Sequence, residues 1–222
     1  MAKRERPILF SGPMVRAILE GRKTQTRRVV KPQPLSMREA ESKGMHGDLV
    51  LDLASYSGVS RLSESRGRNA AAAGVLITHP HCPYGAPGDR LWVRETWWMH
   101  DNQNAFDAED GNVTAPDGTR RLVGYAATMN YDSSRCASEF GCRKRPSIHM
   151  PRWASRLTLE VVAVRVERLQ AISEEDVLAE GIERPLRREY AELWESINGA
   201  GSWDANPFVW VVEFRRLTNG EA

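Results

Sequence analysis

The sequence predicts an α+β fold, a small mixed β-barrel with short helices packed on it. Three observations predict this class: segments with strand patterning outnumber helical segments, the helical segments are short, and the two do not alternate as in a doubly wound sheet. The 222 residues are 41% hydrophobic and 27% charged, which is ordinary for a globular chain and enough for a substantial core. We expect one domain over residues 1–222, with two long loop insertions at about residues 36–74 and 97–145.

A short strand and a short helix open the chain. Residues 7–10 are apolar, and Ser11 follows as a candidate cap for a helix that begins near Pro13. Apolar side chains then recur at helical spacing, and Gly21 stands where a helix ends in a left-handed residue. We therefore expect a strand, one short helix and a stop at Gly21.

An extended segment follows the helix. Within residues 24–30, Thr26 and Arg28 fall on one face and Arg27 on the other. Between residues 36 and 69 the pattern weakens into glycine, serine, glutamate and arginine, which indicates a long surface excursion.

The second half of the chain holds the clearest strands. Residues 90–97 alternate as a strand after a turn-rich segment, whereas residues 101–119 are acidic and rich in glycine and asparagine, which is typical of a loop. Residues 156–169 carry the strongest strand signal and are long enough to curve around a barrel.

Two helices precede the last strand. Ser173 begins a capping-box variant in front of a short helix at residues 174–180, which Gly181 stops. A second helix is expected at residues 186–197, and residues 207–217 return as a final strand. The residues of the second helix at core spacing are Tyr190, Leu193, Trp194 and Ile197.

The net charge of +2 conceals two basic segments. Residues 1–31 hold nine bases against two acids, and residues 143–168 hold seven bases against two acids. If the two segments share a face, that face attracts phosphates, so nucleic acid or a nucleotide is a candidate partner. The alternative is a solvated surface balanced by nearby acids, since residues 97–139 carry seven acids and three bases.

Cysteine usage and the N-terminus favour the cytoplasm. The three cysteines cannot all pair within one chain, and residues 1–7 lack the apolar stretch of a secretory signal. No apolar run approaches the length of a membrane span. We therefore expect a reduced, cytoplasmic protein that does not enter a membrane.

Histidine and cysteine residues raise the alternative of a zinc site, because both are usual zinc ligands. The candidates are His79, His81, Cys82, Cys136, Cys142 and His149. Their spacing matches no compact ligand motif, so we expect no metal and no other cofactor.

A motif follows the first helix directly. The pattern Gly21-x-Lys23-x-x-Thr26-x-Arg28 resembles the signature of the ASCH family, whose members adopt a PUA-like β-barrel and are linked to RNA or modified nucleosides. Asp89, which leads into the strand at residues 90–97, resembles the Gly-Asp step before that family's barrel strand.

The resemblance covers about half of the chain and leaves out the two insertions. The longer patterns at residues 6–10, 90–96 and 148–156 resemble the branch of the family found in tailed bacteriophages and prophages.

Lys23 and Thr26 distinguish between branches of the family. At this spacing they resemble the small bacterial amidohydrolases that deacetylate 4-acetylcytidine and that also use a glutamate on the helix after the long strand. Alignment of that helix places Glu180 at the matching position. The resemblance therefore implies Thr26 as nucleophile, Lys23 as base and Glu180 as proton shuttle.

General chemistry is compatible with these roles. A threonine hydroxyl is a weak nucleophile that needs a nearby base, and the arginines around Lys23 disfavour its protonated form. Arg28, on the Thr26 face, can hold an oxyanion or the substrate carbonyl. The candidate substrate-binding residues are Gly21, Arg22, Arg28, Asp89, Trp97, His149 and Arg152.

Two other functions fit the same residues. One is a binding module that holds RNA or DNA without chemistry, and the other, also known in the family, is a metal-assisted ribonuclease. The expected partner is thus a modified nucleoside or RNA or DNA, and the sequence predicts no oligomeric state.

Overall fold

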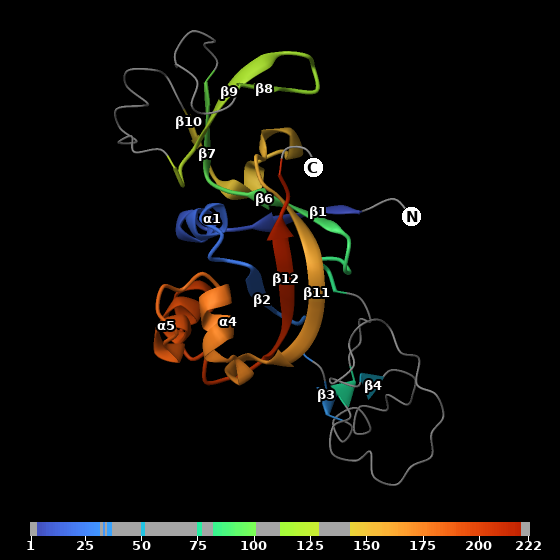
Figure 1. Ribbon diagram of the computed structural model, residues 1–222, viewed down its shortest axis with the longest axis vertical. Coiled ribbons are helices and arrows are strands. Elements are labelled where there is room, and N and C mark those ends of the chain that lie inside the picture. Colours follow the sequence, from blue (N-terminus) through green and yellow to red (C-terminus); the bar gives the residue numbers. More distant parts are fainter. Residues whose placement is uncertain are drawn as a thin grey trace. The chain divides into compact units, whose positions relative to one another are not determined.

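The computed structural model describes residues 4–31, 33, 35–36, 50–51, 75–76, 82–100, 112–128 and 143–218 (Figure 1). These residues form helices and sheets together, which confirms the α+β class. None of the helices in these ranges has the length and apolar character needed to cross a bilayer.

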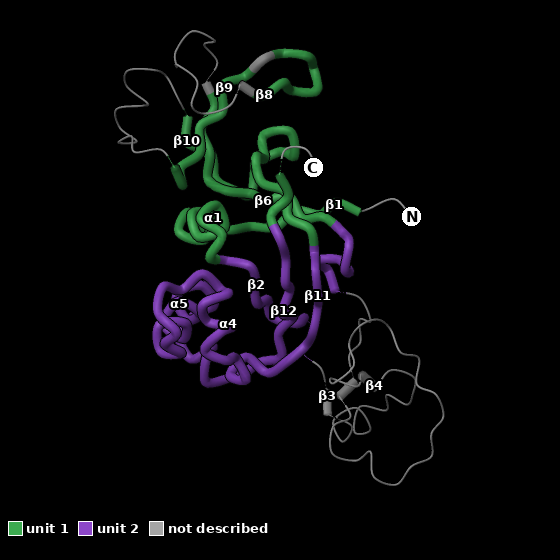
Figure 2. The backbone as a smooth tube through the Cα atoms, in the orientation of Figure 1, with its two compact units in different colours: residues 1–22, 90–160, 216–222 green, residues 23–89, 161–215 purple. Residues whose placement is uncertain are grey.

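The chain forms two compact units (Figure 2). Unit 1 contains residues 1–22, 90–160 and 216–222, and unit 2 contains residues 23–89 and 161–215. Lys23, Thr26 and Glu180 all belong to unit 2, so the candidate site can be described within that unit.

The largest sheet has five strands in the order β1-β6-β11-β12-β2. Their bounds are Glu5–Leu9 for β1, Arg90–Arg94 for β6, Thr158–Arg168 for β11, Phe208–Arg216 for β12 and Gln25–Val29 for β2. β1 runs parallel to β6, while β11 is antiparallel to β6 and β12 is antiparallel to β2. In this order of the described strands β2 is an edge strand. The order is that of an open sheet, so closure into a barrel remains a prediction.

A second, antiparallel sheet has the order β10-β7-β9-β8. Its strands are β7 at Trp97–His100, β8 at Asn112–Thr114, β9 at Arg120–Tyr125 and β10 at Arg143–Arg145. The loop expected at residues 101–119 is therefore wrong where β8 lies, and residues 97–145 contain a sheet as well as connections. Acidic and glycine-rich residues between these short strands hide their alternation in the sequence.

A third sheet consists of β3 (Leu35–Ser36), β5 (Val75–Leu76) and β4 (Val50–Leu51), in that order. Most of the insertion expected at residues 36–74 lies outside the described residues.

The three helices of the described ranges are α1 at Gly12–Leu19, α4 at Glu174–Ala179 and α5 at Arg187–Asn198. Each lies within about two residues of its predicted bounds. Ser11 occupies the N-cap of α1, although its side chain makes no capping hydrogen bond. In α5, Tyr190 and Trp194 are buried as predicted, but Ile197 is 60% exposed. Its predicted place in the core is wrong, because it lies in the last turn of α5, just before the helix ends at Gly199.

The core of unit 1 includes side chains of the second sheet. Trp97, Val123, Tyr125, Met150 and Ala154 form one buried cluster, in which the Tyr125 hydroxyl donates to the Ala154 carbonyl over 2.9 Å. Burial of these side chains provides most of the stabilisation of such a cluster.

The core of unit 2 lies between its helices and strands. Buried side chains of α4 and α5, including Val177, Tyr190 and Trp194, pack with Val209 and Val211 of β12. Figure 1 shows α4 and α5 in orange beside the strands β2 and β12. Because strand side chains alternate, the face of β12 that carries Val209 and Val211 is the face covered by the helices.

Candidate functional site

Lys23 and Glu180 form a buried ion pair in unit 2. The Lys23 Nζ atom donates to Glu180 Oε2 over 2.8 Å and to the Glu180 main-chain oxygen over 2.7 Å. The two side chains are 2% and 5% exposed. Two residues that are far apart in the chain therefore meet at one place, away from bulk water.

The ends of α4 explain why Glu180 is there. Ser173 Oγ accepts from the backbone N–H of Asp176 over 3.1 Å and so caps the start of the helix. Gly181, at φ +90°, ends it in the left-handed region that glycine tolerates. The backbone N–H of Thr24 donates to the Ala179 carbonyl over 2.9 Å, so the segment that enters β2 caps the end of α4.

Arg27 lies at the centre of a larger group of charges. Its side chain is fully buried, and its Nη1 atom donates to Glu180 Oε1 over 3.2 Å. Its Nη2 atom donates to Asp176 Oδ2 over 2.7 Å and to Glu167 Oε1 over 2.5 Å. One guanidinium thus contacts three carboxylates, from β11, from α4 and from the residue that ends α4.

Arg165 of β11 extends this group of charges. It donates to Asp176 Oδ1 over 3.2 Å and to Glu167 Oε2 over 3.2 Å, and it pairs with Glu213 of β12. Its side chain is 33% exposed, so its contacts are more accessible to water than those of Arg27. We call Lys23, Arg27, Arg165, Glu167, Asp176, Glu180 and Glu213 the charge cluster.

Burial and charge shift the pKa values within the charge cluster. Burial lowers the pKa of Lys23, and the Glu180 carboxylate only partly offsets it, while Arg28 and Arg27 lower that pKa further. Burial also opposes the charge of Arg27, but Glu180 and Glu167 outweigh it and raise the pKa of Arg27. Lys23 is therefore easier to deprotonate than an ordinary lysine, whereas Arg27 remains a permanent cation.

Thr26 and Arg28 point away from the helices. Val211 is the register partner of Arg27, whereas Val212 and Trp210 are the partners of Thr26 and Arg28. Since Val211 faces α4 and α5, so does Arg27, and the alternating residues Thr26 and Arg28 face the other side of the sheet. The structure thus brings Lys23 and Glu180 together, and it places Thr26, which is 4% exposed, on the other face of β2.

Gly21 and Arg22 end helix α1. The N–H of Gly21 donates to the Ile18 carbonyl over 3.1 Å and that of Arg22 to the Ala17 carbonyl over 2.9 Å. With Gly21 at φ +76°, this is a Schellman motif. The Arg22 side chain is exposed and binds Glu20 Oε2 over 2.8 Å. These contacts assign both residues a capping role.

Asp89 closes a turn. Its Oδ2 atom accepts from the backbone N–H of Ala86 over 3.1 Å, and a Cβ placed on Gly85 would lie 2.8 Å from the same oxygen. Asp89 therefore shapes the turn before β6, which gives the aspartate of the Gly-Asp step a structural role.

The other predicted binding residues belong to unit 1. Trp97 is 2% exposed and contacts Trp153 edge to face at 6.1 Å. The ring of this candidate substrate-binding residue is thus enclosed in the core of unit 1. His149 is exposed in a 3-10 turn, and Arg152 forms an ion pair with Glu5 over 2.8 Å.

Most of the charge cluster was missed by sequence reasoning. The sequence places Arg27 only on the far face of its strand, Asp176 only in a helix cap, and Glu167 and Arg165 only in a strand. The sequence does offer a partial signal for this cluster. Arg27 falls on the strand face opposite to Thr26, and the acidic residues Glu167 and Asp176 occur in the long strand and in the helix that follows it. The pairing itself depends on strand order, which the alternation of one strand does not specify.

The basic segments are less free to bind phosphate than their charge suggests. Of the bases at residues 143–168, Arg152 pairs with Glu5, Arg156 with Glu95, and Arg165 with three acids. Arg143 and Lys144 of β10 are exposed. Ion pairing thus removes part of the positive surface that the sequence predicted.

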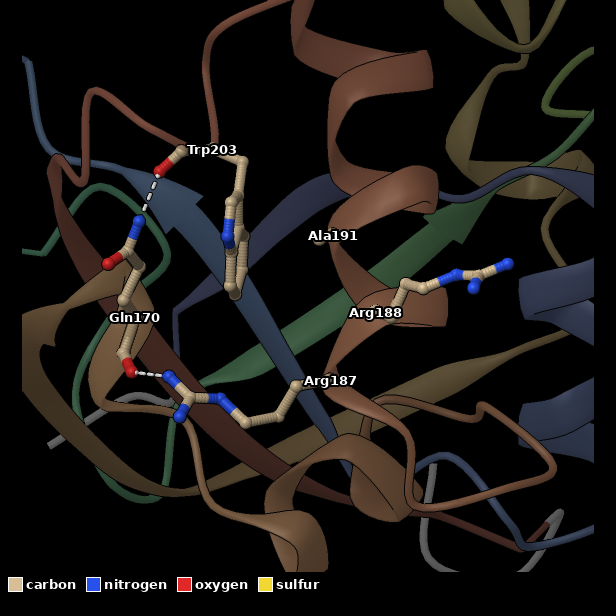
Figure 3. Close-up of a pocket in the computed structure, with 5 residues that line it drawn as sticks. All are labelled: Gln170, Arg187, Arg188, Ala191 and Trp203. Atoms are coloured by element: carbon tan, nitrogen blue, oxygen red, sulfur yellow. Dashed lines mark hydrogen bonds between the residues drawn. The ribbon is translucent and has the colours of Figure 1, made fainter.

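Unit 2 also has an open cavity of about 410 Å³ beside α5 (Figure 3). Gln170 spans its edge by donating to the Trp203 carbonyl over 2.9 Å and by accepting from Arg187. Arg188 and Ala191 complete the lining. None of the predicted site residues lines this cavity.

Of the zinc candidates, His79, His81, Cys136 and Cys142 lie outside the described residues. Cys82 is buried in unit 2 and His149 belongs to unit 1. Among the side chains that the structure describes, no group of three histidine, cysteine or carboxylate ligands is arranged to hold a metal ion.

No protein-family model, no curated protein and no solved structure matches this chain.

Proposed function

We propose that this chain is an ASCH-type protein, in the phage and prophage branch, that acts on a modified cytidine by hydrolysing an acyl amide. The observation that carries the proposal is the Lys23–Glu180 ion pair, with 2.8 Å between Nζ and Oε2. The family resemblance selects these two residues from separate motifs as base and proton shuttle. Their contact is what such a division of roles requires.

The reaction balances with the groups present. Thr26 Oγ1 attacks the acyl carbon, and its hydroxyl proton reaches Lys23 through a bridging water, because Thr26 lies on the opposite face of β2 from the Lys23–Glu180 pair. The bond from carbon to the exocyclic nitrogen breaks, and that nitrogen receives a proton from Lys23, with Glu180 as relay. Water then hydrolyses the threonine ester, which releases the carboxylic acid and restores the hydroxyl.

The environment of Lys23 suits a base. A lysine acts as a base only when it is neutral, and burial lowers its pKa in that direction. The contact with Glu180 gives the proton a second acceptor. Arg28, on the Thr26 face, has the charge to hold the oxyanion of the tetrahedral intermediate.

The position of Thr26 sets a condition on the substrate. Lys23 stands just before β2, and Thr26 points to the face of β2 opposite Arg27. Because β2 is an edge strand among the described strands, a substrate that lies along its free edge can contact both faces.

A binding module for RNA or DNA is the second candidate. A buried ion pair at the end of α4 has a structural use without any chemistry, and the exposed bases Arg143 and Lys144 provide a place for phosphate. Binding of this kind weakens steeply as salt rises. Loss of RNA affinity with salt, together with no turnover of nucleosides, would favour this candidate.

Turnover of 4-acetylcytidine tests the proposal. Purified protein is incubated with the nucleoside, and cytidine is measured by chromatography. We expect turnover in wild type and at least about a hundredfold loss in Thr26→Val, Lys23→Met and Glu180→Gln, on the order of one missing acid–base group. Thr24→Val, which removes an exposed hydroxyl two residues away, is the matched control and keeps activity.

Circular dichroism of each variant separates lost chemistry from lost folding. Absence of turnover in wild type, or full turnover in Thr26→Val, would contradict the proposal. RNA cleavage that appears only with a divalent metal would favour the ribonuclease alternative.

A further inference from the structure

Arg27 contacts both the Glu180 carboxylate and the acids on the opposite side of the charge cluster. Its guanidinium is planar, with five N–H donors in a fixed fork. The fork uses Nη1 for Glu180 and uses Nη2 and Nε for Asp176 and Glu167. With the side chain fully buried, these contacts define a single orientation.

The Glu180 carboxylate is divided between two cations. Oε1 accepts from Arg27 over 3.2 Å, and Oε2 accepts from Lys23 over 2.8 Å. Each oxygen has one charged donor, so rotation of the carboxylate would break both contacts. The carboxylate is therefore fixed with one oxygen presented to the lysine.

Glu167 and Asp176 fix Arg27 from the other side. Glu167 belongs to β11 and Asp176 to α4, and both contact Nη2. The guanidinium is thus held in place independently of Glu180. A lysine at this position would have three rotatable donors on one nitrogen and would lack the rigid planar fork that sets the direction of each contact.

We infer that Arg27 is a positioning residue for the Lys23–Glu180 pair: it binds Glu180 Oε1, so that Oε2 faces the Lys23 amine. Its positive charge also weakens the electrostatic stabilisation of the protonated Lys23 amine by Glu180. Its catalytic consequence rests on the proposed function. The arrangement of the pair itself does not.

Arg165 provides a matched control. It contacts Glu167, Asp176, Gln25 and Glu213, so it shares two acids with Arg27. The bonds that the described residues give it do not include Glu180. A substitution at Arg165 therefore disturbs the same charge cluster without releasing the Glu180 carboxylate.

The readout is the titration of the Lys23 amine, followed by NMR on protein with ¹³C-labelled lysine. The lysines of the chain are few, which keeps the spectrum simple, and Lys23→Met assigns the signal. Arg27→Gln removes a nearby cation and leaves Glu180 to Lys23 alone. We expect the Lys23 midpoint to rise in Arg27→Gln by at least about half a pH unit, and by less than about half of that change in Arg165→Gln.

A charge-balanced variant covers the case in which Arg27→Gln does not fold. Arg27→Gln combined with Glu167→Gln removes one cation and one anion, and the Lys23 midpoint should still rise because Glu180 Oε1 has lost its donor. Glu167→Gln alone serves as its control. An unchanged midpoint in the folded Arg27 variants, or an equal rise in Arg165→Gln, would overturn the inference.

Activity is a separate readout. If wild type hydrolyses 4-acetylcytidine, Arg27→Gln should lower kcat about tenfold or more with little change in KM, and should move the pH profile of kcat to higher pH. If wild type shows no turnover, the proposed function fails, while the titration still decides the role of Arg27.

Discussion

Lys23 and Glu180 are 157 positions apart in the chain, and the amine of Lys23 donates to both the carboxylate and the main-chain oxygen of Glu180. The main-chain contact places a cation at the end of α4, where helix carbonyls lack partners. The carboxylate contact pairs the same cation with an anion away from water. One side chain therefore joins the start of β2 to the end of α4.

Removal of the amine should destabilise the protein. Lys23→Met leaves the Glu180 carboxylate buried with Arg27 as its remaining described cation, and loss of one partner of a buried pair costs about 3 kcal/mol. Urea denaturation measures this cost. Lys31→Met, at an exposed lysine, should change the free energy of unfolding by less than about 0.5 kcal/mol. Equal stability of the two variants would contradict the buried pair.

Asp176 should make stability fall in acid. Burial alone would raise the pKa of Asp176, but Arg27 and the hydrogen bonds of Arg27 and Gln25 outweigh it and lower the pKa from its ordinary value of 3.8. A carboxyl with a lowered pKa stabilises the fold above the unfolded value of 3.8, and that contribution is lost as pH falls through the folded value.

Thermal unfolding between about pH 7 and about pH 2.5 checks this sign. Asp176→Asn should be less stable than wild type at neutral pH, and its stability should fall less below about pH 4. Parallel pH profiles for the two proteins would show that Asp176 does not contribute.

Two arginine–glutamate pairs in unit 1 should differ in how much stability is lost when the arginine is replaced. Arg156 donates to both oxygens of Glu95, whose side chain is 2% exposed, over 2.9 and 3.1 Å. Arg152 and Glu5 are 40% and 36% exposed. Arg156→Met should cost about 3 kcal/mol, whereas Arg152→Met should cost less than about 1 kcal/mol. Chemical denaturation of both variants gives the comparison, and a larger cost at Arg152 would contradict the burial of Glu95.

Any side chain at Gly21 should destabilise the protein through backbone strain. It has φ +76°, and a Cβ added there would meet no atom within 4 Å, so strain alone sets the penalty of Gly21→Ala at about 1 kcal/mol. Gly12, the first residue of α1, would meet only ordinary contacts, and Gly12→Ala should be close to neutral. Urea midpoints of the two variants test the Schellman end of α1, and equal midpoints would argue against it.

Local signals predicted the regular elements well. The Ser173 cap, the stops at Gly21 and Gly181 and the alternation of residues 156–169 each depend on neighbours in the chain, and the structure has α4, α1 and β11 at those places. The short strands of the second sheet were missed because each has only three to six residues, too few for a period to stand out.

The site was predictable in part. Lys23 and Glu180 came from a motif and an alignment, and the structure brings their side chains together, while their selection as site residues and their roles stay predictions. Arg27 and Glu167 could not be selected from the sequence, because the contacts of Arg27 with Glu167 and with Glu180 depend on which strands and helices meet in the fold. The burial of Trp97 could not be foreseen, since a tryptophan beside a charged segment has the same local sequence whether its ring is buried or exposed.

Titration of Lys23 in the wild-type protein tests the central claim most directly. If the amine is buried against Glu180 and Arg27, its NMR midpoint lies below the ordinary lysine pKa of 10.5. A Lys23 midpoint at the ordinary value of 10.5 would mean that the amine is in water, and the buried pair on which the proposed site rests would not exist.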